Sequence, residues 1–174
     1  MSEVSDIGDG DWELWRGFVM MRRQLDRALE QRLQADAGIS GPDFEILLPL
    51  FRTPENQLRA RDLAELLGWE KSRVSHQVTR MAARGLVERR ECPTDLRGSW
   101  ITLTADGRRA VLKASRGNAT ELRRLFFDLL TDEEKIVLAA ASQRVVDAAS
   151  PDSCRRADEI LSGVDRDADT LAAS

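Results

Sequence analysis

Apolar residues recur at helical spacing over the first part of the chain. Between residues 12 and 33 they stand at steps of three and four, which predicts one long helix with a single apolar stripe. A second helix is expected over 42–52, with Pro42 in its first turn, where a missing N–H group is tolerated. The stripe of the first helix is Leu14, Phe18, Met21, Leu25, Leu29 and Leu33.

Two short helices are predicted next. The first covers 60–68 and ends at Gly68, which suits a left-handed C-terminal cap. The second covers 72–84 and is closed in the same way by Gly85. Its apolar face carries Val74, Val78 and Met81. Two short helices joined by a tight glycine-containing turn are typical of a helix-turn-helix.

After Gly85 the apolar period changes from helical to alternating. The segments 86–92 and 99–104 are rich in β-forming residues and flank "PTDLRG", which predicts a two-stranded hairpin with a long tip. Ile101 and Leu103 give the second strand one inward face. A helix-turn-helix followed by such a hairpin is a winged helix.

The rest of the chain is expected to be helical, then polar. Apolar positions indicate helix within 105–130, and the Thr131-x-x-Glu134 spacing is typical of a capping box opening a last helix. The fold class is therefore mostly α with a small β-hairpin wing. The expected division is a flexible acidic N-terminus (1–11), a domain (12–148) with the winged helix at about 42–104 and dimerisation helices at about 12–36 and 105–148, and a polar C-terminal extension (149–174), mobile or marginally helical.

Charge is unevenly distributed along the 174 residues. The net charge is −4, but the window from Lys71 to Lys113 has ten basic and four acidic residues, a net +6, so the remainder carries −10. A basic middle between acidic ends focuses a polyanion on the middle. No apolar run approaches the ~20 residues that cross a bilayer, and the N-terminus lacks a signal pattern, so we expect a cytoplasmic protein without membrane contact.

The predicted second helix of the helix-turn-helix has a polar, basic face opposite its apolar one. Such a helix fits the major groove, where each base pair presents a distinct pattern of donors and acceptors. The alternative is an ordinary solvated helix, which the hairpin directly after it disfavours. The predicted DNA-binding residues here are Lys71, Ser72, Arg73, Ser75, His76, Gln77, Arg80 and Arg89.

The hairpin tip offers a second contact. Arg97 can reach the narrow minor groove, and Asp95 can orient its guanidinium by a charge-assisted hydrogen bond. Asp95 can equally serve only to stabilise the turn.

The order of these motifs resembles the MarR family of bacterial transcription regulators. The resemblance covers roughly 12–148 and is most specific in "DLAELLGWEKSRVSHQVTRMAARGLVERR" and "DLRGSWITLTADGR". It implies a homodimer paired through its N- and C-terminal helices, with one winged helix for each half of a palindromic operator. It also implies that 72–84 is the recognition helix and Arg97 the wing arginine. Such a regulator would lie on the bacterial nucleoid when bound to DNA.

The resemblance further suggests a repressor released by a small aromatic or phenolic ligand. Candidates for lining a pocket are Trp12, Trp15 and Trp100, with Arg16 or His76 as polar anchor. The competing interpretation, which we favour, is that the tryptophans fill the core or an interface.

Other functions are less well supported by the residue types. A thiol-based redox regulator needs a reactive cysteine, and Cys92, which follows Arg89 and Arg90, is the candidate. Cys92 and Cys154 have no metal-ligand spacing, and a lone His76 makes no multi-histidine site, so no metal, cofactor or enzyme activity is expected. A winged-helix protein-interaction module of the anti-repressor type remains an alternative.

Overall fold

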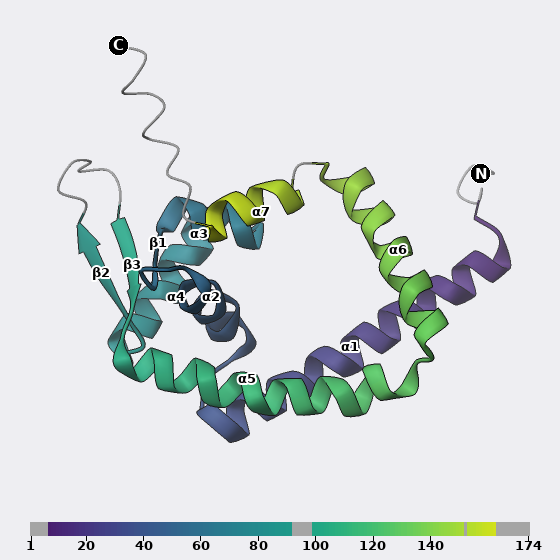
Figure 1. Cartoon of the computed structure of the whole chain (residues 1–174), viewed down its shortest axis with the longest axis horizontal. Helices are drawn as coiled ribbons and strands as arrows, with labels where there is room; N and C mark the ends of the chain where they lie inside the picture. The colour runs from purple at the N-terminus through teal and green to yellow at the C-terminus, as the bar shows by residue number, and fades with distance from the viewer. Residues whose placement is uncertain (1–6, 92–98, 152, 163–174) are drawn as a thin grey trace, which may run out of the picture.

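The computed structural model describes residues 7–91, 99–151 and 153–162, in which a small antiparallel sheet and short helices form one end of the molecule and longer helices extend away from it (Figure 1). The long helix, the helix-turn-helix and the C-terminal helices follow the predicted order. The elements are α1 (Asp9–Ala37), α2 (Gly41–Arg52), β1 (Gln57–Arg59), α3 (Ala60–Leu67), α4 (Lys71–Ala83), β2 (Val87–Glu91), β3 (Ser99–Leu103), α5 (Ala105–Leu125), the 3-10 turn η1 (Phe127–Leu129), α6 (Asp132–Ala149) and α7 (Ser153–Leu161).

The two longest helices, α1 and α5, lie side by side (Figure 1). Gly117 of α5 is buried at their contact, where an added Cβ would overlap the carboxylate of Asp36 in α1. Asp36 is held there by an ion pair with Arg32, one helical turn earlier, at 2.7 Å. The missing side chain at Gly117 therefore lets the two helices approach closely.

Helix α2 is fixed at its N-terminus by side chains from two directions. Ser40 and Asp43 form a capping box, in which each side chain accepts a hydrogen bond from the other residue's backbone N–H group. The N–H group of Gly41 donates to the carboxylate of Glu30 in α1 at 2.6 Å. Pro42 lies in the first turn, as predicted.

The sheet has three strands rather than the predicted two. Its order is β1–β3–β2, with both pairings antiparallel, and Leu58 of β1 lies opposite Ile101 of β3. The additional strand β1 lies between the predicted helices 42–52 and 60–68, where no strand was expected. Ile101 and Leu103 are buried, which confirms the inward face predicted for the hairpin.

One core holds the winged helix together. It lies between α2, α3, α4, the sheet and the first half of α5, and it reaches α1 at Leu33. Val74, Val78 and Met81, the inward residues predicted for the second helix of the helix-turn-helix, are fully buried, which confirms the helical period assigned to them. The largest fully buried apolar side chains are Ile39, Ile46, Leu47, Leu50, Leu63, Val74, Val78, Met81, Val87, Ile101 and Val111.

The C-terminal part of the chain leaves this core and then returns to it. No residue of α6 is buried, and α6 stands apart from the winged helix, whereas α7 lies against α3 (Figure 1). A mobile tail or a marginal helix was expected here; the structure shows a helix over 153–161, and this helix is docked on α3. None of the described helices is both long and apolar enough to cross a membrane.

Candidate nucleic-acid interface

The turn between α3 and α4 is closed by a left-handed glycine. Gly68 has φ 62°, and its N–H group and that of Trp69 donate back to the last turn of α3. Gly85, with φ 72°, ends α4 in the same conformation, and Leu86 N–H donates to the carbonyl of Met81 at 3.0 Å. Both predicted glycine caps are confirmed.

Helix α4 buries one face and exposes the other. Val74, Val78 and Met81 are fully buried against the core, so the opposite side of the helix faces solvent. Most of the residues expected to bind DNA lie on that side. The exposed residues of α4 include Lys71, Ser72, Arg73, Ser75, His76, Thr79 and Arg80.

The expectation that Gln77 is exposed for base contact is wrong. Its side chain is only 5% exposed, and its amide nitrogen donates to the carboxylate of Asp43 at 2.7 Å. Position 77 lies three residues after Val74 and four before Met81, so the helical period puts it on the buried face. Its amide oxygen accepts a hydrogen bond from Arg80, which is exposed. Gln77 thus supports Arg80 instead of facing the groove.

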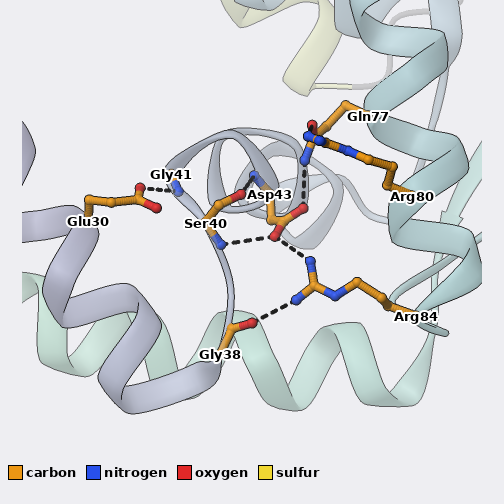
Figure 2. A network of polar contacts seen from close by, with 8 residues as sticks. All are labelled: Glu30, Gly38, Ser40, Gly41, Asp43, Gln77, Arg80 and Arg84. Carbon is orange, nitrogen blue, oxygen red and sulfur yellow. Dashed lines mark hydrogen bonds and ion pairs between the residues drawn. The ribbon is translucent and has the colours of Figure 1, made fainter.

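Asp43 is the centre of a polar network that joins α2 to α4 (Figure 2). One carboxylate oxygen accepts from Gln77, and the other accepts from Arg84 at 2.7 Å and from the backbone of Ser40 at 2.9 Å. Arg84 also donates to the carbonyl of Gly38, at the end of α1, at 2.7 Å. The middle of α4, at Gln77, is therefore bound to α2. Arg84, directly after the end of α4, is bound both to α2 and to the turn between α1 and α2.

The electrostatics of Asp43 match this geometry. The side chain is 1% exposed, and burial alone would raise its pKa. Hydrogen bonds from the Ser40 backbone and from Arg84 outweigh burial and hold the pKa of Asp43 below its ordinary value. Asp43 is therefore ionised at neutral pH, and its negative charge is matched by the guanidinium of Arg84.

Arg73, at the start of α4, is held against the helix-turn-helix turn. Its guanidinium lies 3.8 Å from the centre of the Trp69 ring, a cation–π contact. Burial raises the pKa of Glu45 in α2, while the nearby charge of Arg73 opposes that rise. Stacking limits the positions that Arg73 samples, so a phosphate or base contact by Arg73 would start from an ordered side chain.

Arg89 connects the first strand of the wing to α4. Its guanidinium donates to the backbone carbonyl of Ser75 at 2.9 Å and to the Ser75 hydroxyl at 3.2 Å. Both residues are exposed, so the pair adds a positive charge beside the exposed face of α4. Asp95, Arg97 and Cys92 lie outside the described residues.

Comparisons with known proteins identify this arrangement. A family model described as the MarR family matches residues 37–98. AbsC, a MarR family transcriptional regulator from Streptomyces coelicolor, is 33% identical with a TM-score of 0.79, covering 84% of this chain and 98% of AbsC. This chain belongs to the MarR family. It is a transcriptional regulator with the winged helix-turn-helix fold that the motif order predicted.

Two further relatives agree. Sco3205, a MarR family transcriptional regulator from Streptomyces coelicolor whose structure is a complex with DNA, is 29% identical with a TM-score of 0.81, covering 87% of this chain and 94% of Sco3205. The HTH-type transcriptional repressor YetL of Bacillus subtilis is 25% identical over 131 residues, 75% of this chain and 77% of YetL.

The candidate ligand residues do not come together within one chain of this MarR-family protein. Trp12, Trp15 and Arg16 are exposed on the first turns of α1, where Trp15 stacks on Phe18. Trp100 is half-buried on β3, beneath the guanidinium of Arg59 at 5.1 Å, and β3 and the start of α1 lie at opposite ends of Figure 1. A pocket shared by all four is therefore not formed by a single chain.

The sequence reading missed Asp43, Arg84 and Trp69. Asp43 had a detectable signal, because Ser40-x-x-Asp43 before an apolar run has the spacing of a capping box. That spacing predicts the helix start but not the contacts with α4, which come from residues 34 and 41 positions later in the chain. Arg84 and Trp69 had no local signal for their roles.

Proposed function

We propose that this chain is a homodimeric repressor that binds palindromic double-stranded DNA through α4 and the wing of each subunit. The observation that carries the proposal is the division of α4 into two faces. One face is buried and tied to α2 through Asp43, while the other presents Ser72, Ser75, His76 and Arg80 to solvent. A helix held rigidly on one side, with donors and acceptors on the other, suits the major groove.

The distribution of charge and the similarity to a DNA-bound relative support the DNA-binding part of the proposal. Lys71, Arg73, Arg80 and Arg89 surround the exposed face of α4 and can neutralise phosphates. The relative Sco3205 was crystallised with DNA and matches this fold over most of both chains. We assign Arg97 the minor-groove contact and Asp95 the role of orienting it, as the sequence motif suggests.

The homodimer is supported by apolar side chains that the single chain leaves in water. Leu14 of α1 and Leu129 of η1 are each 73% exposed, and Ile136 and Val137 of α6 are 70% and 67% exposed. Such a concentration of exposed apolar residues on the terminal helices marks an interaction surface. A two-fold dimer is the commonest way to cover it and sets two recognition helices about one DNA turn, ~34 Å, apart.

Repression and ligand release complete the proposal. Repression is supported by the likeness to the repressor YetL. Trp12 and Trp15 lie exposed on the part of α1 that a partner subunit would cover, so a site for an aromatic ligand would be completed by the partner. A ligand there releases DNA only by binding the DNA-free conformation more tightly.

A salt titration tests the proposal. Binding of a fluorescent pool of random duplexes is measured by anisotropy at increasing salt concentration. We expect log affinity to fall linearly with log salt, because each neutralised phosphate releases counterions. Arg80→Ala should reduce the slope by about one unit, while Arg123→Ala, on an exposed arginine of α5, should leave it unchanged. Absence of binding at low salt would overturn the proposal.

A further inference from the structure

Helix α6 has almost no support from its own chain. None of its residues is buried, and it contacts the rest of the described structure only weakly. The N-terminus of α6 follows η1, which packs on α5, and the C-terminus of α6 leads to α7 (Figure 1). The orientation of α6 relative to the winged helix is therefore set at its two ends.

Helix α7 provides the second of these anchors. With nine residues it is shorter than the ~12–15 needed for a helix to persist alone in water, so its helical state depends on contacts with the rest of the chain. Ala157, Ile160 and Leu161 are half-buried at steps of three and four, and Ile160 packs against the core. Arg156 forms an ion pair with Glu65 of α3 at 3.0 Å.

The position of α7 on α3 matters because α3 is packed on α4. Leu63 and Ala64 on the other side of α3 are buried in the core that also holds Val74 and Val78 of α4. Glu65, which receives Arg156, is exposed on the outer side. A displacement imposed on α7 is thus passed through α3 to the helix proposed to enter the major groove.

The connection between α6 and α7 is too short for the two helices to move independently. Helix α6 ends at Ala149, α7 begins at Ser153, and the Ser150 N–H group still donates to the carbonyl of Val146 at 2.8 Å. The Cα atoms of Ala149 and Ser153 are four residues apart, so they can be separated by at most about 14 Å when the chain is fully extended. The end of α6 can therefore move only a short distance while α7 remains on α3.

We infer that α7 is an intramolecular clasp that fastens the helix-turn-helix to the C-terminal arm formed by α6. Its consequence rests on the proposed homodimer: with α6 fixed in the dimer interface, the clasp limits how far each α4 moves relative to the two-fold axis. The clasp thereby narrows the range of half-site spacings that the dimer accepts.

The clasp itself is tested in the full-length protein by hydrogen exchange, without DNA. Ile160→Asp removes the apolar anchor, and Asp158→Ala, on an exposed position of the same helix, is the matched control. Ile160→Asp should speed exchange of the α7 amides by about tenfold or more, because burial of one large aliphatic side chain is lost. Wild-type α7 exchanging as fast as an unfolded peptide would overturn the clasp.

Whether α7 docks on its own chain is tested by cross-linking. In a Cys92→Ser, Cys154→Ser background, Glu65→Cys and Arg156→Cys replace the two ends of the ion pair, and a short bismaleimide is added. We expect an internal link that leaves the chain monomer-sized on a denaturing gel. A covalent dimer would show that α7 docks on the partner and would overturn the intramolecular assignment.

The effect on the spacing between the two α4 helices of the dimer is measured by pulsed electron–electron double resonance. The spin labels are attached at Thr79→Cys in the same cysteine-free background. The distribution of distances between the two labels should be narrow in the parent protein. With Ile160→Asp it should be at least about twofold broader, because the winged helices are no longer held by α7 and sample more positions. An unchanged width with α7 released would overturn the positional role. Absence of dipolar coupling in the parent would reject the homodimer and the spacing effect, while hydrogen exchange would still decide the clasp.

Discussion

Asp43 joins α2 to α4 through one carboxylate, and its partner Arg84 also contacts the end of α1, so replacing Asp43 should destabilise the whole winged helix. Asp43→Asn leaves Arg84 without its charged partner and Gln77 with a poorer acceptor. We expect a loss of about 2 kcal/mol in the free energy of unfolding, measured by urea denaturation, because Arg84 and the Ser40 backbone lose hydrogen bonds to a charged acceptor. Glu13→Gln, on an exposed carboxylate of α1, should change it by less than about 0.5 kcal/mol.

The same residue predicts a pH dependence. The pKa of Asp43 is lower in the folded protein than its ordinary value of about 3.9, so the carboxylate stabilises the fold fully above that pH. This contribution is lost as the pH falls through the lower, folded-state pKa. The stability difference between wild type and Asp43→Asn should therefore shrink as urea denaturation is repeated below about pH 4. A difference that stays constant would contradict the assignment.

His76 and Gln77 are neighbours with opposite expected roles. His76 is exposed on α4, so His76→Ala should weaken binding to a preferred duplex by about tenfold and relax its sequence preference, at unchanged stability. Gln77→Ala should lower stability, because Asp43 loses a donor, without altering which base is preferred. Binding-site selection and denaturation of both variants check this, and a changed base preference in Gln77→Ala alone would refute the burial argument.

At the residue scale, the sequence predicted burial better than it predicted polar contacts. The helical period of Val74, Val78 and Met81 correctly identified the buried face of α4. Position 77 lies on the same face. Because Gln77 is polar, it was wrongly assigned to the exposed face of α4. Its hydrogen-bond partner Asp43 lies on another helix and could not be inferred from the local sequence. Pairing between side chains distant in sequence leaves no local pattern.

At the scale of elements, Gly107 fixes how α5 begins. Its N–H group donates to the hydroxyl of Thr104, and an added Cβ would overlap the backbone carbonyl of Leu86. Gly107→Ala should therefore cost about 2 kcal/mol or more in the free energy of unfolding, because backbone has to move. Gly17→Ala in α1, where nothing lies within 4 Å, should stabilise by up to about 1 kcal/mol. Thermal unfolding of both variants measures the contrast, and equal effects would refute it.

Elements with strong local signals were predicted well. Apolar period, glycine caps and the Thr131 capping box placed the helices α1 to α4 and α6 within a few residues of their observed ends, whereas the break between α5 and η1 at Phe126 was not predicted. β1 was missed because it has only three residues and pairs with β3, more than 40 positions later. The docking of α7 was missed because its half-buried face fits α3, a surface that exists only after folding.

At the scale of the whole molecule, the proposed function requires a dimer formed through the terminal helices. Ile136→Asp places a charge on an α6 surface that a partner would bury, so the dimer should weaken at least about tenfold. Ser162→Asp adds the same charge at the exposed end of α7 and should not affect assembly. Sedimentation equilibrium measures both, and an unweakened Ile136→Asp dimer would exclude α6 from the interface.

Binding-site selection on randomised duplex DNA tests the central claim, sequence-specific recognition by a two-fold pair of winged helices, most directly. We expect enrichment of one inverted repeat whose half-site centres are about one helical turn, ~34 Å, apart. His76→Ala should relax the preference within each half-site while retaining salt-dependent binding to any duplex. A pool that shows no enriched sequence after repeated rounds at low salt, with folded wild-type protein, would contradict the account.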